Sequence, residues 1–283
     1  MSGIRQQPGQ GQGQSPAGRP VSGRPRPPRR PWRPSVSIVA CLIAAALGAV
    51  AHTGSTALTV VGLAVPMTML AIGWVSLLRL PSPRGTTIVQ LIAVVVLLVP
   101  AMVRPRTTLE WLPAAVAVAM IATFVHQLVR RDARPRLVES VSASAAGVAL
   151  LSSAVCLVPL VTADAGRDAV TAVMAATAAA TLADIGLGRV PRGIIAVSCA
   201  LASVLLGAVV AVVVHTMFGS SDLPVVALAG GIAGGASYAI RQIQSVLPSL
   251  WGRRAQLASA AGSVLCTGAV AYGLAWLVDV PLG

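Results

Sequence analysis

Nine long apolar runs divide the sequence, and each is long enough to cross a lipid bilayer as a helix. The bilayer core needs about 20 apolar residues per helix, and the runs are continuous rather than alternating, which favours helix over strand. Because backbone polar groups must be paired within the protein in lipid, the sequence predicts an all-α, polytopic transmembrane helix bundle. The predicted spans lie near 35–52, 57–78, 86–103, 109–129, 138–162, 169–187, 193–216, 223–240 and 255–278.

The composition also indicates a surface covered largely by lipid. Of the 283 residues, 55% are hydrophobic and only 10% are charged, whereas about 25% are charged in a typical soluble domain. All 21 basic residues are arginine, and those beyond the amino-terminal segment fall in short stretches between the runs. A basic nucleic-acid binder would carry aromatic residues beside its basic groups. We therefore attribute the net charge of +13 to membrane topology and expect no nucleic-acid partner.

The first 34 residues differ from the rest of the chain. They contain eight prolines, six glycines and seven arginines, with almost no large apolar side chain. Such a segment buries too little surface to offset the entropy of ordering it, so residues 1–34 are predicted to form a disordered, basic cytoplasmic tail. A cleaved signal peptide is the alternative, but the tail is long for one and eight more apolar runs follow. Residues 35–283 are predicted to form the transmembrane domain.

The arginines are distributed unevenly between the two sides of this predicted topology. With the amino terminus inside, 18 of the 21 arginines fall in the tail and the cytoplasmic loops, and three fall in outer loops. An excess of basic residues marks the cytoplasmic side, and the five tryptophans lie at run ends, near the headgroups that their rings prefer. We predict a protein of the cytoplasmic membrane, with its carboxyl terminus outside. The predicted cytoplasmic loops are 79–85, 130–137, 188–192 and 241–254.

Four glycines in the eighth run, LPVVALAGGIAGGASYAI, are spaced for close helix packing. Gly230 and Gly234 are four residues apart, as are Gly231 and Gly235. Small residues at this spacing let two helix backbones approach each other closely. The pattern predicts a packing seam within the bundle, and it leaves open a homo- or hetero-oligomer contact or a ligand path lined by backbone.

Chemistry, if present, is expected at the cytoplasmic ends of the helices. The middles of the runs are nearly free of ionisable groups, which a proton-coupled transporter would need there. Asp132, Glu139 and Asp184 are the candidate catalytic carboxylates, because carboxylates can hold a divalent ion beside arginines that hold phosphate. The alternative is that the acids are solvated partners of arginines that anchor the topology. The arginines expected to contact anionic lipid headgroups are Arg130, Arg131, Arg134, Arg136, Arg189 and Arg192.

No motif in the sequence points to a metal or a cofactor. The four cysteines lie in four different apolar runs, without the close spacing of a zinc or redox motif. Nucleophile elbows, phosphate loops and zinc patterns are likewise missing from the sequence. We therefore expect no metal and no cofactor.

One segment resembles a known enzyme family. An apolar run, then RRDARPRLVES, then a run of small residues is similar to the middle of CDP-diacylglycerol synthases (phosphatidate cytidylyltransferases), around residues 126–160. The resemblance implies a many-helix membrane protein with metal and nucleotide chemistry at its cytoplasmic face. The carboxyl-terminal signature of that family combines Lys, Arg, Gly and several Asp, whereas the corresponding segment here, RQIQSVLPSLWGRR, has no acid and no lysine. The chain as a whole resembles multi-pass membrane proteins of actinobacteria, which implies no particular activity.

Three function classes follow from these patterns. The leading hypothesis is a non-enzymatic, permease-like or scaffold protein that handles a small apolar or lipid molecule. The second is a lipid-modifying enzyme with a cytoplasmic-face site, similar to CDP-diacylglycerol synthase. The third is a structural subunit of a membrane complex. The expected partner in each case is the bilayer, with anionic lipid headgroups at the cytoplasmic face.

Overall fold

The computed structural model describes residues 34–130, 136–187, 195–218 and 223–277. All the elements below belong to one compact unit, Trp32–Gly283. The predicted disordered tail lies almost wholly outside the described residues.

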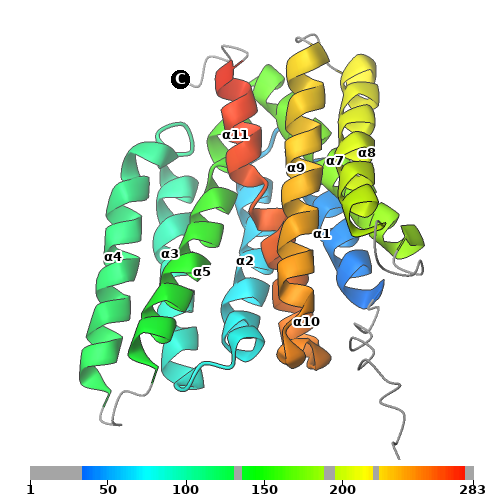
Figure 1. Ribbon diagram of the computed structural model, residues 1–283. Coiled ribbons are helices and arrows are strands. Elements are labelled where there is room, and N and C mark those ends of the chain that lie inside the picture. Colours follow the sequence, from blue (N-terminus) through cyan, green and yellow to red (C-terminus); the bar gives the residue numbers. More distant parts are fainter. Residues whose placement is uncertain (1–33, 131–135, 188–194, 219–222, 278–283) are drawn as a thin grey trace, which may run out of the picture. The chain divides into compact units, whose positions relative to one another are not determined.

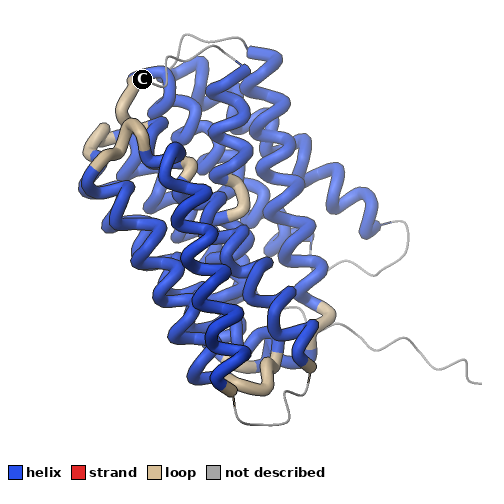
Figure 2. The backbone as a smooth tube through the Cα atoms, turned by 90° about the vertical axis from the view of Figure 1, so that its left-hand side faces the viewer, coloured by secondary structure: helices blue, strands red, loops and turns tan. Residues whose placement is uncertain are grey.

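Every regular element in these ranges is a helix (Figure 1; Figure 2). Nine stretches of the described chain are long and apolar enough to cross a membrane, counting α5 with α6 and α10 with α11 as single spans. The predicted all-α, multi-pass membrane architecture is therefore confirmed. The elements are α1 (Pro34–His52), α2 (Thr56–Leu78), α3 (Pro83–Val103), α4 (Thr108–Val129), α5 (Leu137–Val155), α6 (Leu157–Leu160), α7 (Asp164–Leu187), α8 (Ile195–Phe218), α9 (Leu223–Ser245), the 3-10 helix η1 (Pro248–Trp251), α10 (Arg253–Leu265) and α11 (Gly268–Leu277).

Four elements differ from the sequence-based expectation. The sixth span was predicted to begin at residue 169, whereas α7 begins at Asp164. The fifth and ninth spans are each interrupted, at Cys156 and at Cys266 and Thr267, where single helices were predicted. The eighth span was predicted to end at residue 240, with Arg241 in a loop. That placement is wrong, because α9 continues to Ser245. Neither glycine nor proline follows residue 240 before Pro248, so nothing in the sequence breaks the helix there.

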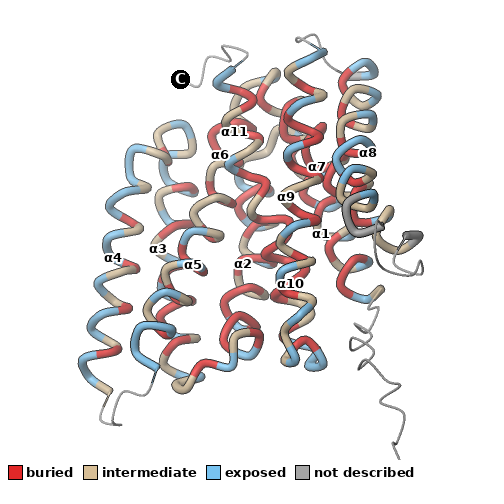
Figure 3. Tube along the Cα trace, viewed as in Figure 1, coloured by how far each residue is buried: buried red, intermediate tan, exposed pale blue. Residues whose placement is uncertain are grey.

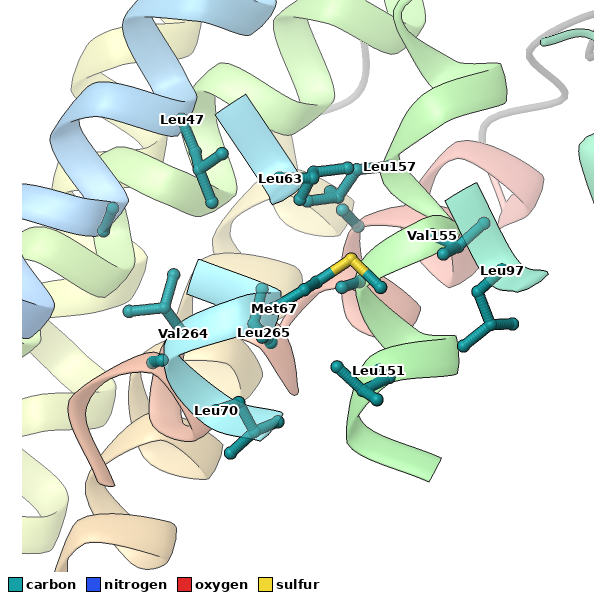
Figure 4. Close-up of a cluster of buried hydrophobic side chains, with 14 of the residues drawn as sticks. Leu47, Leu63, Met67, Leu70, Leu97, Leu151, Val155, Leu157, Val264 and Leu265 are labelled. Atoms are coloured by element: carbon teal, nitrogen blue, oxygen red, sulfur yellow. The ribbon is translucent and has the colours of Figure 1, made fainter. Parts of the chain in front are cut away.

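The core of the unit is built around α2. Leu63, Met67 and Leu70 are fully buried, and their spacing places them on one stripe of the helix. They belong to one apolar cluster with residues of α1, α3, α5, α6 and α10 (Figure 4). The labelled members from those helices are Leu47, Leu97, Leu151, Val155, Leu157, Val264 and Leu265.

The outer faces of the helices are apolar and exposed. Figure 3 shows the exposed residues along the outer sides of α4 and α8, and they include Ile121 and Leu205, which are 61% and 64% exposed. Large apolar side chains on the outside would be unfavourable in water. In a bilayer they face acyl chains, as a membrane-spanning bundle requires.

Helices α8 and α9 touch backbone to backbone. A Cβ atom placed on Gly207 would lie 2.5 Å from the carbonyl oxygen of Gly230, and one on Gly230 would lie 2.6 Å from the carbonyl oxygen of Gly207. One on Gly234 would lie 2.7 Å from the carbonyl oxygen of Ser203. Glycine is required at these positions because any side chain would push the two helices apart.

The other two glycines of the eighth run also face α8. A Cβ atom on Gly235 would lie 2.9 Å from Val204 Cγ2, and one on Gly231 would lie 3.3 Å from Val204 Cγ1. All four glycines therefore contact a helix of the same chain. An oligomer formed through α9 stays a prediction, and it would use side chains that α8 leaves exposed, such as Leu228 and Ile232.

We expect Gly207→Ala to destabilise the protein, because the new methyl group overlaps the Gly230 carbonyl oxygen. Overpacking of this kind costs about 1–3 kcal/mol. The measurement is the midpoint of thermal unfolding in detergent, which should fall by several degrees. Gly273→Ala is the matched control, since no atom lies within 4 Å of a Cβ atom there. Equal midpoints for the two variants would contradict the close α8–α9 contact.

Candidate functional site

A buried ion pair joins α7 and α9 inside the bundle. Arg241 Nε donates a hydrogen bond of 2.8 Å to Asp184 Oδ2, and Arg241 Nη2 lies 2.6 Å from the same oxygen. The two side chains are only 5% and 12% exposed. Charged groups in the interior of a membrane protein are costly unless they are paired, and they usually mark functional positions. This pair is therefore the first candidate for a functional site.

The same guanidinium group also contacts α10. Arg241 Nη1 donates to Ser237 Oγ at 2.5 Å and to Ser263 Oγ at 3.4 Å. Ser237 lies one turn earlier on α9, whereas Ser263 comes from α10. Arg241 thus bridges three helices that are separate in the sequence.

Two further polar side chains extend this site along α9 and α10. Gln244 Oε1 and Ser259 Oγ are buried, and neither has a hydrogen-bond partner among the described residues. A buried oxygen without a partner costs about 1–3 kcal/mol. We call the set the polar seam. It consists of Asp184, Ser237, Arg241, Gln244, Ser259 and Ser263.

The polar seam leads toward the interruption of the ninth span. Ser259, Ser263 and Thr267 are all buried, and they repeat every four residues, the spacing that keeps side chains on one helix face. Eight residues of helix correspond to about 12 Å. A line of buried hydroxyl groups therefore connects the ion pair with the break between α10 and α11.

The two interrupted spans meet at this break. Ser153 Oγ of α5 donates to the carbonyl oxygen of Cys266 at 3.0 Å and accepts from Ala269 N at 3.0 Å. A Cβ atom on Gly268 would lie 2.1 Å from the Ser153 carbonyl oxygen, so α11 starts directly against the α5 backbone. One serine thus satisfies backbone groups that the interruption of the ninth span leaves unpaired.

The candidate carboxylates do not share one site in the described part of the chain. Glu139 is exposed and pairs with Arg136, which also donates from Nη1 to the carbonyl oxygen of Arg79 at 3.1 Å. Asp184 pairs with Arg241 instead. Asp132 lies outside the described residues. Within those residues no group of three or more His, Cys, Asp or Glu side chains is placed to hold a metal ion.

Of the arginines expected to contact lipid headgroups, two are described. Arg130 Nη1 donates to Gln127 Oε1 at 3.0 Å, and Arg136 has the contacts given above. Both lie at helix ends, beside α4 and α5. Headgroup contact by these residues stays a prediction. The remaining four, Arg131, Arg134, Arg189 and Arg192, lie outside the described residues.

A second group of buried polar residues fastens α5 to its neighbours. Gln127 Nε2 donates to Ser140 Oγ at 2.8 Å, and Gln90 Nε2 donates to the carbonyl oxygen of Ser144 at 3.1 Å. Trp74 Nε1 donates to the carbonyl oxygen of Ala143 at 2.8 Å. These bonds join α2, α3 and α4 to α5, so we assign this group a packing role.

Arg241 is a candidate site residue that the sequence did not single out. Because it follows the end of the apolar run, it was predicted to lie in the cytoplasmic loop 241–254. The signal that identifies it is spacing, since Gly230, Gly234, Ser237 and Arg241 recur every three or four residues. That spacing extends the small-residue face of α9 through Arg241 and predicts that its side chain points into the bundle.

Comparison of the chain with protein-family models, with curated proteins and with solved structures finds no match. The resemblance of residues 126–160 to CDP-diacylglycerol synthases therefore stays a prediction. Function has to be inferred from the geometry of the seam and of the interrupted spans.

We expect Arg241→Gln to destabilise the protein by about 3–5 kcal/mol, because it leaves the Asp184 carboxylate buried without a counter-charge. The measurement is the free energy of unfolding in mixed detergent. A second variant that combines Arg241→Gln with Asp184→Asn should recover part of this loss, since it removes both charges.

Arg136→Gln is the matched control for this measurement. It breaks an ion pair whose side chains are 49% and 59% exposed, and exposed pairs contribute little to stability. If Arg241→Gln were no more destabilising than Arg136→Gln, the ion pair would not be buried as described.

Proposed function

We propose that this protein is a non-enzymatic, permease-like protein of the cytoplasmic membrane that handles a lipid or another small, largely apolar molecule. The observation that carries the proposal is the meeting of two interrupted spans beside the polar seam. Ser153 links the interruptions through its bonds to Cys266 and Ala269.

Interrupted helices support a permease-like function for a physical reason. Irregular backbone at membrane depth is tolerated only where protein buries it or where it lines a cavity. In secondary transporters, interruptions of membrane helices form substrate sites and allow one part of the bundle to move against another. The interruptions here are short, since Cys156 and Cys266 keep right-handed helical torsion angles. The break between α10 and α11 lies where α5 and α11 are in contact. A movement of α11 would therefore change the hydrogen bond between Ser153 and Ala269.

The chemistry of the seam supports a molecule with few polar atoms. Asp184 and Arg241 neutralise each other, which leaves Gln244 Oε1 and Ser259 Oγ as oxygens that can still accept a hydrogen bond. The surrounding helices are apolar. A ligand with one or two hydrogen-bond donors and an otherwise apolar body would match these groups better than a sugar or an ion would. It would reach them when the helices move apart, since both oxygens are buried.

The described arginines support the proposed orientation. Apart from the buried Arg241, six lie at the end of the bundle where α2, α4 and α9 finish, and three lie at the other end (Figure 1). The first end corresponds to the cytoplasmic side if basic residues are retained inside. This orientation places the amino terminus in the cytoplasm and the carboxyl terminus outside. The six are Arg79, Arg84, Arg130, Arg136, Arg253 and Arg254, and the three are Arg104, Arg106 and Arg167.

The proposed activity is tested with vesicles that contain the purified protein and a fluorescent phospholipid. We expect the protein to speed the exchange of the labelled lipid between leaflets, measured by the fraction that a membrane-impermeant quencher reaches over time. Ser263→Leu should reduce this exchange to the rate of protein-free vesicles, because it replaces the hydroxyl group that contacts Arg241 with an apolar side chain.

Ser142→Leu is the control for the exchange assay, because Ser142 is exposed and bonds to its own helix through the Glu139 carbonyl oxygen. Its exchange rate should equal that of the unaltered protein. Exchange by the unaltered protein no faster than in protein-free vesicles would refute the proposed activity on lipids.

The orientation is tested with a reporter enzyme that is active only outside the cytoplasm. We expect activity for a fusion after Gly283 and none for a fusion after Arg136, because an odd number of proposed spans separates the two positions. A fluorescent protein that folds only in the cytoplasm serves as the converse reporter. Activity at Arg136 and silence at Gly283 would reverse the proposed topology.

A further inference from the structure

A groove on the outside of α2 contains none of the residues of the polar seam. It has a volume of about 510 Å³ and lies between α2 and the start of α10. Its walls are almost entirely apolar, and its principal side chains are Val61, Val65, Met69, Ile72, Leu257 and Arg254. The seam residue Ser263 lies on a different face of α10, since it contacts Arg241 of α9.

The groove opens toward the bilayer. Val61, Val65 and Ile72 are 59%, 55% and 40% exposed, and all three belong to a span that is long and apolar enough to cross a membrane. The stretch from Val61 to Gly73 corresponds to about 18 Å of helix. An apolar trough of this length, open to the side of a membrane helix, suits an extended hydrocarbon chain.

One end of the groove is marked by a cation. Arg254 is the single charged residue among the described side chains that line it. The guanidinium group is exposed and has no hydrogen bond or ion pair to any described residue. The backbones of α2 and α10 are in contact at this end of the groove, because a Cβ atom on Gly73 would lie 2.2 Å from the Arg254 carbonyl oxygen. The groove therefore runs from Arg254 along α2 toward Val61.

The surroundings of Arg254 suit an anion at the level of the lipid headgroups. Arg253 and Arg254 form the first turn of α10, which contains no acidic residue and has no side-chain cap. The start of a helix carries a partial positive charge. Trp251, two residues before the start of α10, is 72% exposed. Tryptophan rings are enriched at the membrane interface.

We propose that this groove binds one phospholipid with an anionic headgroup. Its phosphate contacts Arg254, and one acyl chain lies along α2 from Ile72 to Val61. A second copy of this chain fits less well. In a symmetric pair the same surface faces itself, which would bring the two Arg254 side chains to the same depth with like charges. This site is independent of the proposed lipid exchange through the seam.

The experiment is native mass spectrometry of the purified full chain in detergent. Phosphatidylglycerol or phosphatidylcholine with the same acyl chains is added, and the number of lipids retained per protein is counted. We expect one phosphatidylglycerol to be retained in preference to phosphatidylcholine. Arg254→Gln should weaken this binding about fivefold, the effect of losing one arginine near an anionic phosphate. Arg106→Gln, at an exposed arginine beside α4, should leave it unchanged.

A second pair of variants tests the apolar part of the groove. Val65→Trp fills the groove and should displace the retained lipid. Ile121→Trp adds the same side chain on the exposed face of α4, and this variant should still retain the lipid. Thermal unfolding midpoints equal to that of the unaltered protein show that the variants fold.

Four outcomes would overturn the proposal. They are equal retention of the two lipids, retention unaffected by Arg254→Gln, equal losses in Val65→Trp and Ile121→Trp, and a dimer in light scattering that Val65→Trp dissociates. The last outcome would assign the groove to a second copy of this chain. Retention of phosphatidylglycerol without lipid exchange in vesicles would refute the proposed function alone, whereas exchange without selective retention would refute the groove site alone.

Discussion

The requirement that every polar backbone group be paired away from lipid controls this structure. Continuous helices pair these groups within each span. At the interruption of the ninth span, a side chain of α5 pairs them instead. Ser153 donates to one freed carbonyl group and accepts from one freed N–H group at the break between α10 and α11. The interruption is therefore possible only because α5 lies against it, and the direct contact at Gly268 keeps the two segments together.

The same rule applied to charge explains where the ionisable groups lie. Arg136 and Glu139 are at a helix end, where their pair is exposed. Arg241 and Asp184 lie inside the bundle, where each is tolerated because the other is in contact with it. The second pair consequently holds α7 against α9, and its serine contacts extend that link to α10.

Helix α10 connects the two proposed sites because it presents a different chemistry on each side. Ser263 on one face contacts Arg241 of α9, and Leu257 on another face lines the groove on α2. Gly73 allows α10 to start directly on the α2 backbone. The helix is thus packed on both sides, polar within the bundle and apolar toward the bilayer.

The sequence by itself determined that the chain is an all-α, multi-pass membrane protein, because span length and hydropathy are properties of consecutive residues. It also located the glycine face of the eighth run, since that face depends only on helical spacing. Only the tertiary structure decided that Arg241 meets Asp184, that Ser153 closes the break at Cys266, and that a groove forms beside Arg254. These features depend on which helices become neighbours. In lipid, apolar residues are equally well solvated on all sides, so the hydropathy pattern carries no information about that choice.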